Sequence, residues 1–367
     1  MVVRFLSTTI LGVSAGVSSS PRDALVTTDV RLEKLESWLT HLFGAREFDI
    51  RPASADASFR RYFRVTRGES TLIAMDAPPD KEDLGPYVQV ARMLADIGVN
   101  APRVLERNDA EGFLLLSDLG SRTYLAELQA GGDAERLYND AIDALVRIQA
   151  GGVEHAKLLP PYDEALLRRE ISLFPEWFCA RHLRLNPEEA RLGSVYDTLI
   201  AEALAQPKVL VHRDYHSRNL MVGDGARFGE NPGILDFQDA VHGPLTYDLV
   251  SVLRDCYIAW PLAQVEKWVA RFHEQARAAG VSVHSERSDL MRAFDLMGVQ
   301  RHLKAIGIFA RLWHRDGKPG YLRDIPRTLG YVKEVSARYP ELAALRTWID
   351  EGVEPAMLTL QARERAQ

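Results

Sequence analysis

Cysteine is scarce in this chain, and long apolar runs are absent. Cys179 and Cys256 are the only cysteines among 367 residues, which is too few for a disulfide framework and gives no metal-binding pattern. This scarcity fits a reducing compartment. No apolar run reaches the length needed to span a bilayer. We therefore expect neither a disulfide-stabilised secreted domain nor a membrane protein.

An excess of positive charge is also missing. The formal net charge is −6 at pH 7, which argues against a surface whose main role is to bind nucleic acid. The chain has no internal repeat and no low-complexity linker, and nothing in it indicates an obligate protein partner. With 46% hydrophobic residues, it can bury a large core and is near the length at which one core divides into two lobes.

What the chain does contain is a polar motif within residues 209–239. The motif combines His212-Arg213-Asp214, four further residues, Asn219 and, after an apolar run, Asp236. This order of parts, HRDxxxxN and then an aspartate at a strand end, occurs in the phosphoryl-transfer core of protein kinases. That chemistry needs a carboxylate facing the acceptor hydroxyl and separate oxygen ligands for magnesium. We predict that Asp214 is catalytic and that Asn219 and Asp236 bind Mg²⁺ beside ATP.

Two short apolar runs, residues 209–211 and 220–222, flank the polar loop. Their β-branched composition indicates strands, and we expect them to pair as a hairpin that holds Asp214 and Asn219 at one end. A solvated hairpin loop with incidental charges is the alternative, but a complete motif followed by a second metal-type aspartate favours the catalytic interpretation. Asp248, farther along, either caps a helix or bonds back to this loop.

The residues before the motif predict a small antiparallel sheet. A helical pattern starts at residue 29, strand patterns occupy 49–52, 59–66, 70–75, 101–105 and 113–116, and a helix occupies 84–97. Beyond residue 119 almost everything except the motif has the periodicity of amphipathic helices. We therefore predict an α+β chain with a protein-kinase-like two-lobed fold: a mixed N-lobe at 29–118 that covers the nucleotide, and a larger helical C-lobe at 119–367 that carries the catalytic loop and the acceptor site.

The residues that would bind the nucleotide are harder to choose. Kinases cover the phosphates with a glycine-rich loop, but the turn at 53–58 has no glycine. Its backbone amides and the hydroxyls of Ser54 and Ser58 would have to replace that loop, and an ordinary hairpin turn explains the pattern equally well. Ser117 and Leu119 lie where a kinase hinge binds adenine, a position that is also compatible with a helix N-cap.

The lysine that kinases carry on their third strand is absent, because Met75 occupies the aligned position. Arg60 or Arg61 on the neighbouring strand would supply the missing cation, or Lys81 from the following loop. All three also fit solvated charges, so the nucleotide cation stays open.

These features resemble the aminoglycoside phosphotransferase group of small-molecule kinases, which share the protein-kinase-like fold. The resemblance rests on the HRDxxxxN loop, the following Ile-Leu-Asp-Phe and the Leu-Leu-Leu-Ser-Asp-Leu-Gly junction at 114–120. More narrowly, the chain is similar to bacterial kinases that phosphorylate N-acetylmuramate and N-acetylglucosamine at C1, over residues 58–65, 75–79, 174–177, 211–221 and 299–312. The similarity covers about residues 32–358, and the methionine at position 75 belongs to it. It implies an ATP- and Mg²⁺-dependent sugar 1-kinase that returns peptidoglycan sugars toward the UDP-activated precursor.

A basic stretch at residues 300–318 suits an anionic sugar acceptor. Asp316 is its only acid, although a solvated helix face explains the pattern equally well. We predict sugar contacts from Arg301 and His302 in this stretch, and from Asp239 and His242 on the loop after Asp236. Glu170 is a further candidate that fits a surface charge equally well.

Other interpretations remain open at this point. A nucleotide-binding pseudokinase is favoured by Met75 alone, whereas the presence of Asp214, Asn219 and Asp236 favours an active enzyme. Amino-alcohol kinases of the choline type and antibiotic phosphotransferases compete with the sugar kinase. A protein kinase is disfavoured because no segment ending in Ala-Pro-Glu follows Asp236.

Residues 1–28 carry the least information. They hold a moderately apolar run that Ser, Thr and Gly interrupt, after a single Arg4. A secretory signal is one reading, but such signals have a more basic start and a stronger apolar centre, and an enzyme that uses ATP would lack its cosubstrate outside the cytosol. We expect a flexible leader, or residues read from an upstream start codon, and a cytoplasmic protein.

Overall fold

The computed structural model describes residues 29–54 and 59–365. Contacts within the chain divide it into two compact units, with the boundary between Arg46 and Glu47. The predicted leader at 1–28 lies outside the described residues. The predicted boundary between the lobes, at residue 118, falls inside the second unit and stays a prediction.

Helix α1 (Val30–Phe43) belongs to the first unit and confirms the helix expected from residue 29 onward. Asp29 caps it, since its side chain accepts the N–H of Leu32 at 3.0 Å and so satisfies one of the amides that a first turn leaves without a partner. Gly44 ends the helix with φ at +72°, a left-handed conformation that glycine adopts without steric cost.

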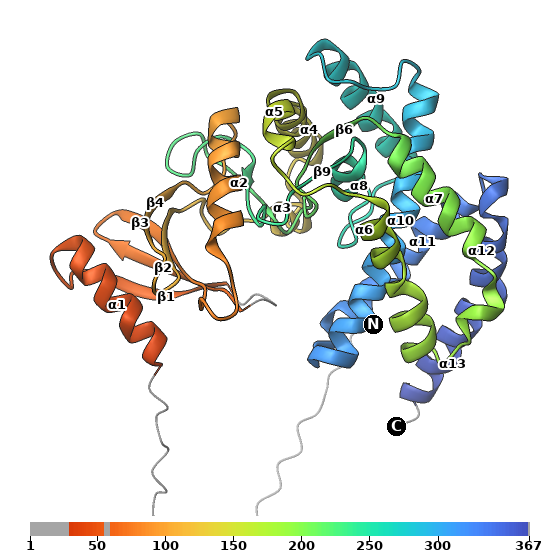
Figure 1. Ribbon diagram of the computed structural model, residues 1–367, viewed down its shortest axis with the longest axis horizontal. Coiled ribbons are helices and arrows are strands. Elements are labelled where there is room, and N and C mark those ends of the chain that lie inside the picture. Colours follow the sequence, from red (N-terminus) through yellow and green to blue (C-terminus); the bar gives the residue numbers. More distant parts are fainter. Residues whose placement is uncertain (1–28, 55–58, 366–367) are drawn as a thin grey trace, which may run out of the picture. The chain divides into compact units, whose positions relative to one another are not determined.

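The second unit begins with a five-stranded antiparallel sheet, which confirms the fold expected for this region (Figure 1). The strands, in the spatial order β1-β2-β3-β5-β4, are β1 (Asp49–Ser54), β2 (Arg61–Arg67), β3 (Ser70–Asp76), β5 (Phe113–Ser117) and β4 (Val104–Asn108). Strand β5 lies between two neighbours, and four of its five residues are buried. A strand in such a position has a continuous apolar run rather than an alternating one.

Alternation along β2 directs polar side chains to one face of the sheet. Phe63 and Val65 are buried, whereas Tyr62 and Arg64 are only partly buried. Successive side chains of a strand point to opposite faces, so Tyr62 and Arg64 share the second face. Ile73 pairs with Arg64 in the register of β2 and β3 and lies beside them on the wall of the pocket described below.

Helix α2 (Leu84–Ile97) has the predicted bounds, with Asp83 as its N-cap. Its buried side chains Leu84 and Tyr87 belong to the same hydrophobic core as Met75, which is fully buried. The strand position where kinases carry a lysine is therefore occupied by a core residue. Any cation for the nucleotide must come from another part of the chain.

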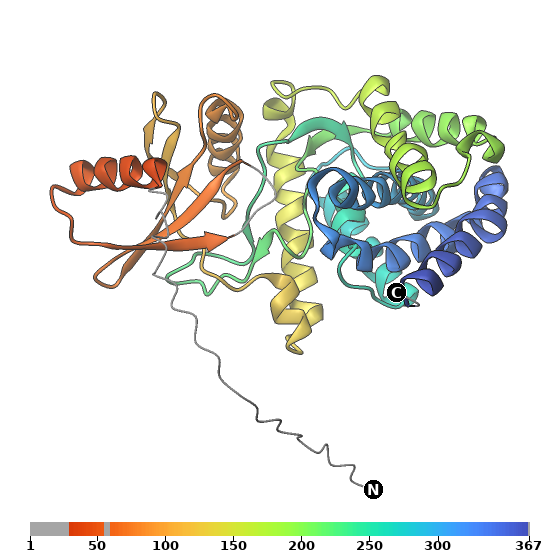
Figure 2. The ribbon, with the colours of Figure 1, turned by 90° about the horizontal axis from the view of Figure 1, so that it is seen from below.

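The chain after β5 is mainly helical, as predicted, and Figure 2 shows α4 between the sheet and the later helices of the second unit. The α-helices are α3 (Tyr124–Gln129), α4 (Ala134–Gly151), α5 (Val153–Ala156), α6 (Glu164–Ile171), α7 (Gly193–Ala205), α8 (Tyr247–Leu253), α9 (Leu262–Ala278), α10 (Arg287–Asp316), α11 (Ile325–Ser336), α12 (Ala343–Trp348) and α13 (Glu354–Arg365). Segments of π or 3₁₀ geometry join some of them: η1 (Phe174–His182), η2 (Pro187–Ala190), η3 (Pro319–Asp324), η4 (Pro340–Leu342) and η5 (Ile349–Val353).

Helix α10 contributes to two clusters of buried apolar side chains. Leu290 and Phe294 pack into the cluster that also contains Met75 of the sheet. Val299 and Leu303, farther along the helix, pack into a second cluster with side chains of α11 and α12. Among the helices of residues 29–54 and 59–365, none combines the length and apolarity that a membrane crossing requires.

The strands around the catalytic motif pair differently from our prediction. Residues 209–211 and 220–222 do not form a hairpin: β6 (Lys208–Val211) pairs with β9 (Val241–Pro244), and β7 (Leu220–Met221) pairs with β8 (Gly233–Ile234). The prediction was wrong because strand propensity identifies a strand but not its partner. The observed pairing has a chemical consequence, since it joins the segment after Asn219 to the segment before Asp236.

We predict that α10 cannot accept a side chain at Gly307. A Cβ atom there would lie 2.3 Å from the backbone carbon of Leu173, whereas a Cβ at Gly298 on the same helix would meet its nearest neighbour, Val250, at 3.6 Å. Gly307→Ala should therefore lower the free energy of unfolding by about 1–3 kcal/mol. Gly298→Ala is the matched control and should raise it by up to about 1 kcal/mol through helix propensity. Equal denaturation midpoints for the two variants would contradict the packing argument.

Candidate active site

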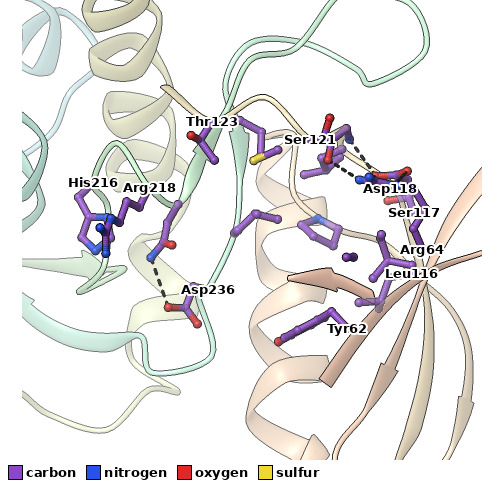
Figure 3. A pocket seen from close by; sticks show the side chains of 18 of the residues that line it. Tyr62, Arg64, Leu116, Ser117, Asp118, Ser121, Thr123, His216, Arg218 and Asp236 are labelled. Carbon is purple, nitrogen blue, oxygen red and sulfur yellow. Dashed lines mark hydrogen bonds and ion pairs between the residues drawn. The ribbon is translucent and has the colours of Figure 1, made fainter. Parts of the chain in front are cut away.

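A pocket of about 510 Å³ opens between the sheet and the catalytic motif (Figure 3). Its size is that of a typical small-molecule site. One wall comes from the sheet and carries Tyr62, Arg64 and Ile73. The last residue of β5 and the segment that follows it, residues 117–121, form a second wall, which we call the hinge. The third wall comes from the motif and the helical region and carries His216, Arg218, Asn219, Met221, Leu235, Asp236, Tyr257 and Tyr321.

The structure brings together the three residues predicted for catalysis and metal binding. The side-chain amide of Asn219 donates to the backbone carbonyl of Asp214 at 3.1 Å and to Oδ2 of Asp236 at 3.3 Å. Gln238 donates to the other carboxylate oxygen of Asp236 at 2.9 Å. Two chain segments thus meet at one cluster of hard oxygen atoms. Their roles stay predictions, and their proximity is what those roles require.

Two buried carboxylates hold the catalytic loop, which we define as residues 212–219. Asp248 accepts the backbone N–H groups of His212 at 2.6 Å and Arg213 at 3.0 Å. Asp255 accepts the N–H of Ser217 at 2.9 Å. Asp248 therefore bonds back to the loop, which was one of its two expected roles. Burial raises the pKa of Asp248 to about 7, against the opposing effect of these N–H donors.

The charges around Asp214 keep its carboxylate ionised. Burial by itself would raise the pKa of Asp214, but His216, Lys304, His212 and Arg213 outweigh it and hold the pKa below the ordinary value. A carboxylate that is ionised at neutral pH can accept a proton from an acceptor hydroxyl.

Glu170 lies among the cations behind the loop and does not line the pocket. It is buried and accepts hydrogen bonds from Tyr162 and Arg213, and from Lys304 at 2.8 Å. Burial would raise its pKa, but Lys304 and Arg213 hold it below the ordinary value. The structure thus gives Glu170 internal partners, as the counter-charge of two buried cations.

The other residues predicted to contact the sugar also lie off the pocket wall. His302 is buried, donates to the carbonyl of Arg254 at 2.8 Å and stacks on Tyr331; burial lowers its pKa to about 3. Arg301 is 6% exposed and contacts Cys256, with its NH1 3.8 Å from the sulfur.

Asp239 and His242 follow Asp236 along the chain. Asp239 is exposed, and its carbonyl lies 3.5 Å from Arg213. His242 belongs to β9, where its backbone bonds Pro160 and Tyr162. Sugar contacts by Asp239, His242, Arg301, His302 and Glu170 stay predictions, while the described pocket wall consists of other side chains.

An ion pair that the sequence did not reveal fixes the hinge to the sheet. Arg64 donates to both carboxylate oxygens of Asp118, at 2.8 and 3.0 Å, and to the carbonyl of Gly120 at 2.7 Å. Ser117 and Leu119, predicted to bind the nucleotide, lie on the same wall. The hydroxyl of Ser117 accepts the N–H of Arg103 at 2.9 Å. Ser58 and the side chain of Ser54 lie outside the described residues.

The three candidates for the nucleotide cation differ in their surroundings. Arg61 donates twice to Asp76, at 3.0 and 2.6 Å. Lys81 is exposed and lies 3.5 Å from Asp80. For Arg60, burial favours a lower pKa, but Tyr62, Asp236 and Glu82 together raise the pKa above its ordinary value. The negative charge of Asp236, the predicted metal ligand, therefore acts on Arg60.

Sequence reasoning missed several residues of the pocket wall, among them His216, Arg218, Tyr257 and Tyr321. His216 and Arg218 were visible as part of an unusually charged loop, which was the only signal available for them. The two tyrosines come from distant segments of unremarkable composition, so only the folded chain places them at the site.

Comparison with known families assigns the chain to one of them. Residues 49–284 match the model of the phosphotransferase enzyme family, known as APH. The chain belongs to that family. The matched segment runs from β1 to beyond α9, and it contains every lining residue of the pocket except Tyr321.

Curated relatives extend the similarity over most of the chain. The N-acetylmuramate/N-acetylglucosamine kinase of Pseudomonas aeruginosa is 49% identical over 330 residues, which cover 86% of this chain and 95% of that protein. The kinase of the same name from Neisseria meningitidis serogroup B is 48% identical over 319 residues, 85% of this chain and 93% of that protein.

Solved structures of low sequence identity confirm the predicted kinase-like fold. Choline kinase LicA from Streptococcus pneumoniae is 10% identical, with a TM-score of 0.58, and covers 84% of this chain and 99% of that one. The GDP complex of aminoglycoside 2'-phosphotransferase-IIIa is 16% identical, with a TM-score of 0.56, and covers 84% of this chain and 99% of that one.

We predict that Asp248 supports catalysis through the loop backbone. In Asp248→Asn, the side-chain amide nitrogen would replace one of the two carboxylate oxygens. The backbone N–H of either His212 or Arg213 would then lose its buried acceptor. The free energy of unfolding should fall by about 1–3 kcal/mol, and phosphotransfer should slow by roughly 10²-fold because the loop is displaced. Asp197→Asn is the control, since Asp197 is an exposed partner of Arg168 and surface pairs contribute little. Wild-type turnover in Asp248→Asn would refute this role.

Proposed function

We propose that the protein transfers the γ-phosphoryl group of ATP to the anomeric C1 hydroxyl of N-acetylmuramate and N-acetylglucosamine. The observation that carries the proposal is that Asn219 lies on the pocket wall and joins Asp236, on the same wall, to the backbone carbonyl of Asp214. The curated relatives of the chain bear that kinase name. ATP is a cytosolic cosubstrate, so we place the reaction in the cytoplasm. There the product would return recycled peptidoglycan sugars toward a UDP-activated precursor.

The reaction needs little from the protein beyond position and charge. The C1 hydroxyl is a hemiacetal group and more acidic than an ordinary alcohol, so a carboxylate of low pKa suffices as its proton acceptor. Asp214 takes the proton while the oxygen forms a bond to the γ-phosphorus and the bond to the leaving ADP breaks. The products are the sugar 1-phosphate and ADP.

The oxygen donors of Asn219 and Asp236 fit Mg²⁺. A carboxylate and an amide lie within hydrogen-bond distance of each other on the pocket wall, which brings hard oxygen ligands within reach of one small cation. When bound, the ion would neutralise charge on the phosphates. Gln238 holds the second oxygen of Asp236 and so orients the carboxylate.

The hinge suits the adenine end of the nucleotide. Arg64 holds it through Asp118 and Gly120, so its backbone is oriented before a ligand arrives. Ser117 and Leu119 lie on its surface facing the pocket. Backbone N–H and C=O groups there would recognise the base, as we expected from the position of this segment.

Phosphorus NMR of the reaction products tests the proposal directly. With ATP, Mg²⁺ and either sugar we expect one sugar phosphate whose phosphorus couples to the C1 proton. The methyl glycoside of N-acetylglucosamine lacks a free C1 hydroxyl and should give none. Asp214→Asn should slow transfer by roughly 10²–10⁴-fold and still bind ATP in calorimetry. Phosphorylation of the methyl glycoside, or of choline instead of the sugars, would disprove the assignment.

A second prediction concerns the nucleotide cation. Arg60 lies in the field of Asp236, so Arg60→Met should raise the KM for ATP by about tenfold, the effect of losing one charge-assisted contact. Arg61→Met is the matched control on the adjacent residue. Arg61 is already hydrogen-bonded to Asp76. The KM of Arg61→Met for ATP should therefore stay within about twofold of the wild-type value. If the two variants have the same KM, Arg60 is not the cation.

A further inference from the structure

Arg218 faces the pocket, and its hydrogen-bond donors have no partner in the part of the chain that the structure describes. Its central carbon lies 3.9 Å from the ring centroid of Tyr257 and 5.5 Å from that of Tyr321. Within residues 29–54 and 59–365 it has no hydrogen-bond or ion-pair partner. A guanidinium carries five N–H donors in a planar fork that matches a carboxylate. Arg218 is therefore oriented by aromatic rings and ready to bind an anion.

The neighbouring cations are already engaged. Arg64, which also lines the pocket, is bound to Asp118. Arg213 and Lys304 are bound to Glu170 behind the catalytic loop. Arg218 is thus the arginine of the described pocket wall that is free to receive a ligand.

The surroundings hold Arg218 in this orientation. Asp255 accepts the N–H of Ser217 at 2.9 Å and the N–H of Tyr257 at 2.8 Å. The same carboxylate therefore fixes both the residue beside Arg218 and the ring under it. Behind Tyr321, the ring of Phe309 stacks at 5.7 Å. We call Arg218, Tyr257 and Tyr321 the acceptor wall.

The acceptor wall lies beyond the predicted metal ligands as seen from the nucleotide end. Figure 3 shows His216 and Arg218 on one side of Asp236, with Tyr62 and Leu116 on the other. Adenine at the hinge and phosphates at Asp236 would fill the part nearer the sheet. That arrangement would leave the part of the pocket past Asp236, beside His216 and Arg218 of the catalytic loop, for the phosphoryl acceptor.

We propose that Arg218 binds the lactyl carboxylate of N-acetylmuramate and so determines how well the enzyme uses that sugar relative to N-acetylglucosamine. The inference rests on the proposed function. Both sugars present the same C1 hydroxyl to Asp214, so residues at the reacting atoms cannot tell them apart. The carboxylate on the lactyl ether is the one anionic group that distinguishes them, and Arg218 is the open cation on the acceptor wall.

The test compares kcat/KM for the two sugars in wild type and in Arg218→Met, which keeps most of the apolar length. Loss of a bidentate charge-assisted contact should lower the value for N-acetylmuramate by about tenfold to a hundredfold. The value for N-acetylglucosamine should change by less than about threefold, which also shows that the variant is folded. Arg218→Lys keeps the positive charge but lacks the planar guanidinium. Its kcat/KM for N-acetylmuramate should lie between the values for wild type and Arg218→Met.

The methyl ester of N-acetylmuramate separates carboxylate recognition from a general effect. Wild type should use the ester about tenfold to a hundredfold less efficiently than the acid, and Arg218→Met should not distinguish them. Arg323→Met is the control for the loss of a positive charge, because Arg323 is an exposed residue of the segment that carries Tyr321. It should leave the ratio of the two sugars unchanged.

Other outcomes overturn the inference. Equal losses on both sugars would assign Arg218 to the transferred phosphate or to the shape of the loop. No loss on either sugar would leave it without a role in the reaction. If wild type phosphorylates neither sugar, the proposed function itself fails, and the inference fails with it.

Discussion

The backbone of the catalytic loop depends on two carboxylates that have no access to solvent. Asp248 and Asp255 accept three amide protons from the loop, whose chain is neither helix nor strand and so cannot satisfy these groups itself. They also hold a strained conformation, since Arg213 has φ at +77°, which costs a side-chain-bearing residue about 1–3 kcal/mol. Asp255 also accepts the backbone N–H of Tyr257. One carboxylate therefore binds both the catalytic loop and the acceptor wall.

Charge balance around Asp214 follows from the same arrangement. The loop carries Arg213 into a buried region, where α10 adds Lys304 and α6 supplies Glu170 as their common partner. Buried ions cost free energy unless they are paired, and this set pairs two cations with one anion. The unbalanced positive charge favours the ionised form of Asp214. Structural support and catalytic electrostatics are thus provided by one group of residues.

Local patterns predicted much of the architecture correctly. The bounds of α2 and the presence of a five-stranded sheet followed from periodicity and capping residues, because these depend on neighbours along the chain. The strand predicted at 101–105 was misplaced, since β4 spans Val104–Asn108. The pairing of β6 and β7 was mispredicted, because strand partners are chosen by the whole fold. The ion pair between Arg64 and Asp118 was not predicted either, since nothing in either segment indicates the other.

The sequence by itself was enough to predict the reaction type, since Asp214, Asn219 and Asp236 belong to one motif with the spacing that kinases use. It could not determine which arginine lines the pocket. Arg301 and Arg218 look alike as members of charged stretches, yet the fold buries Arg301 beside Cys256 and leaves Arg218 open on two tyrosine rings. Only tertiary structure decides this, because the partner of a charge is set by distances between segments that are far apart in the chain.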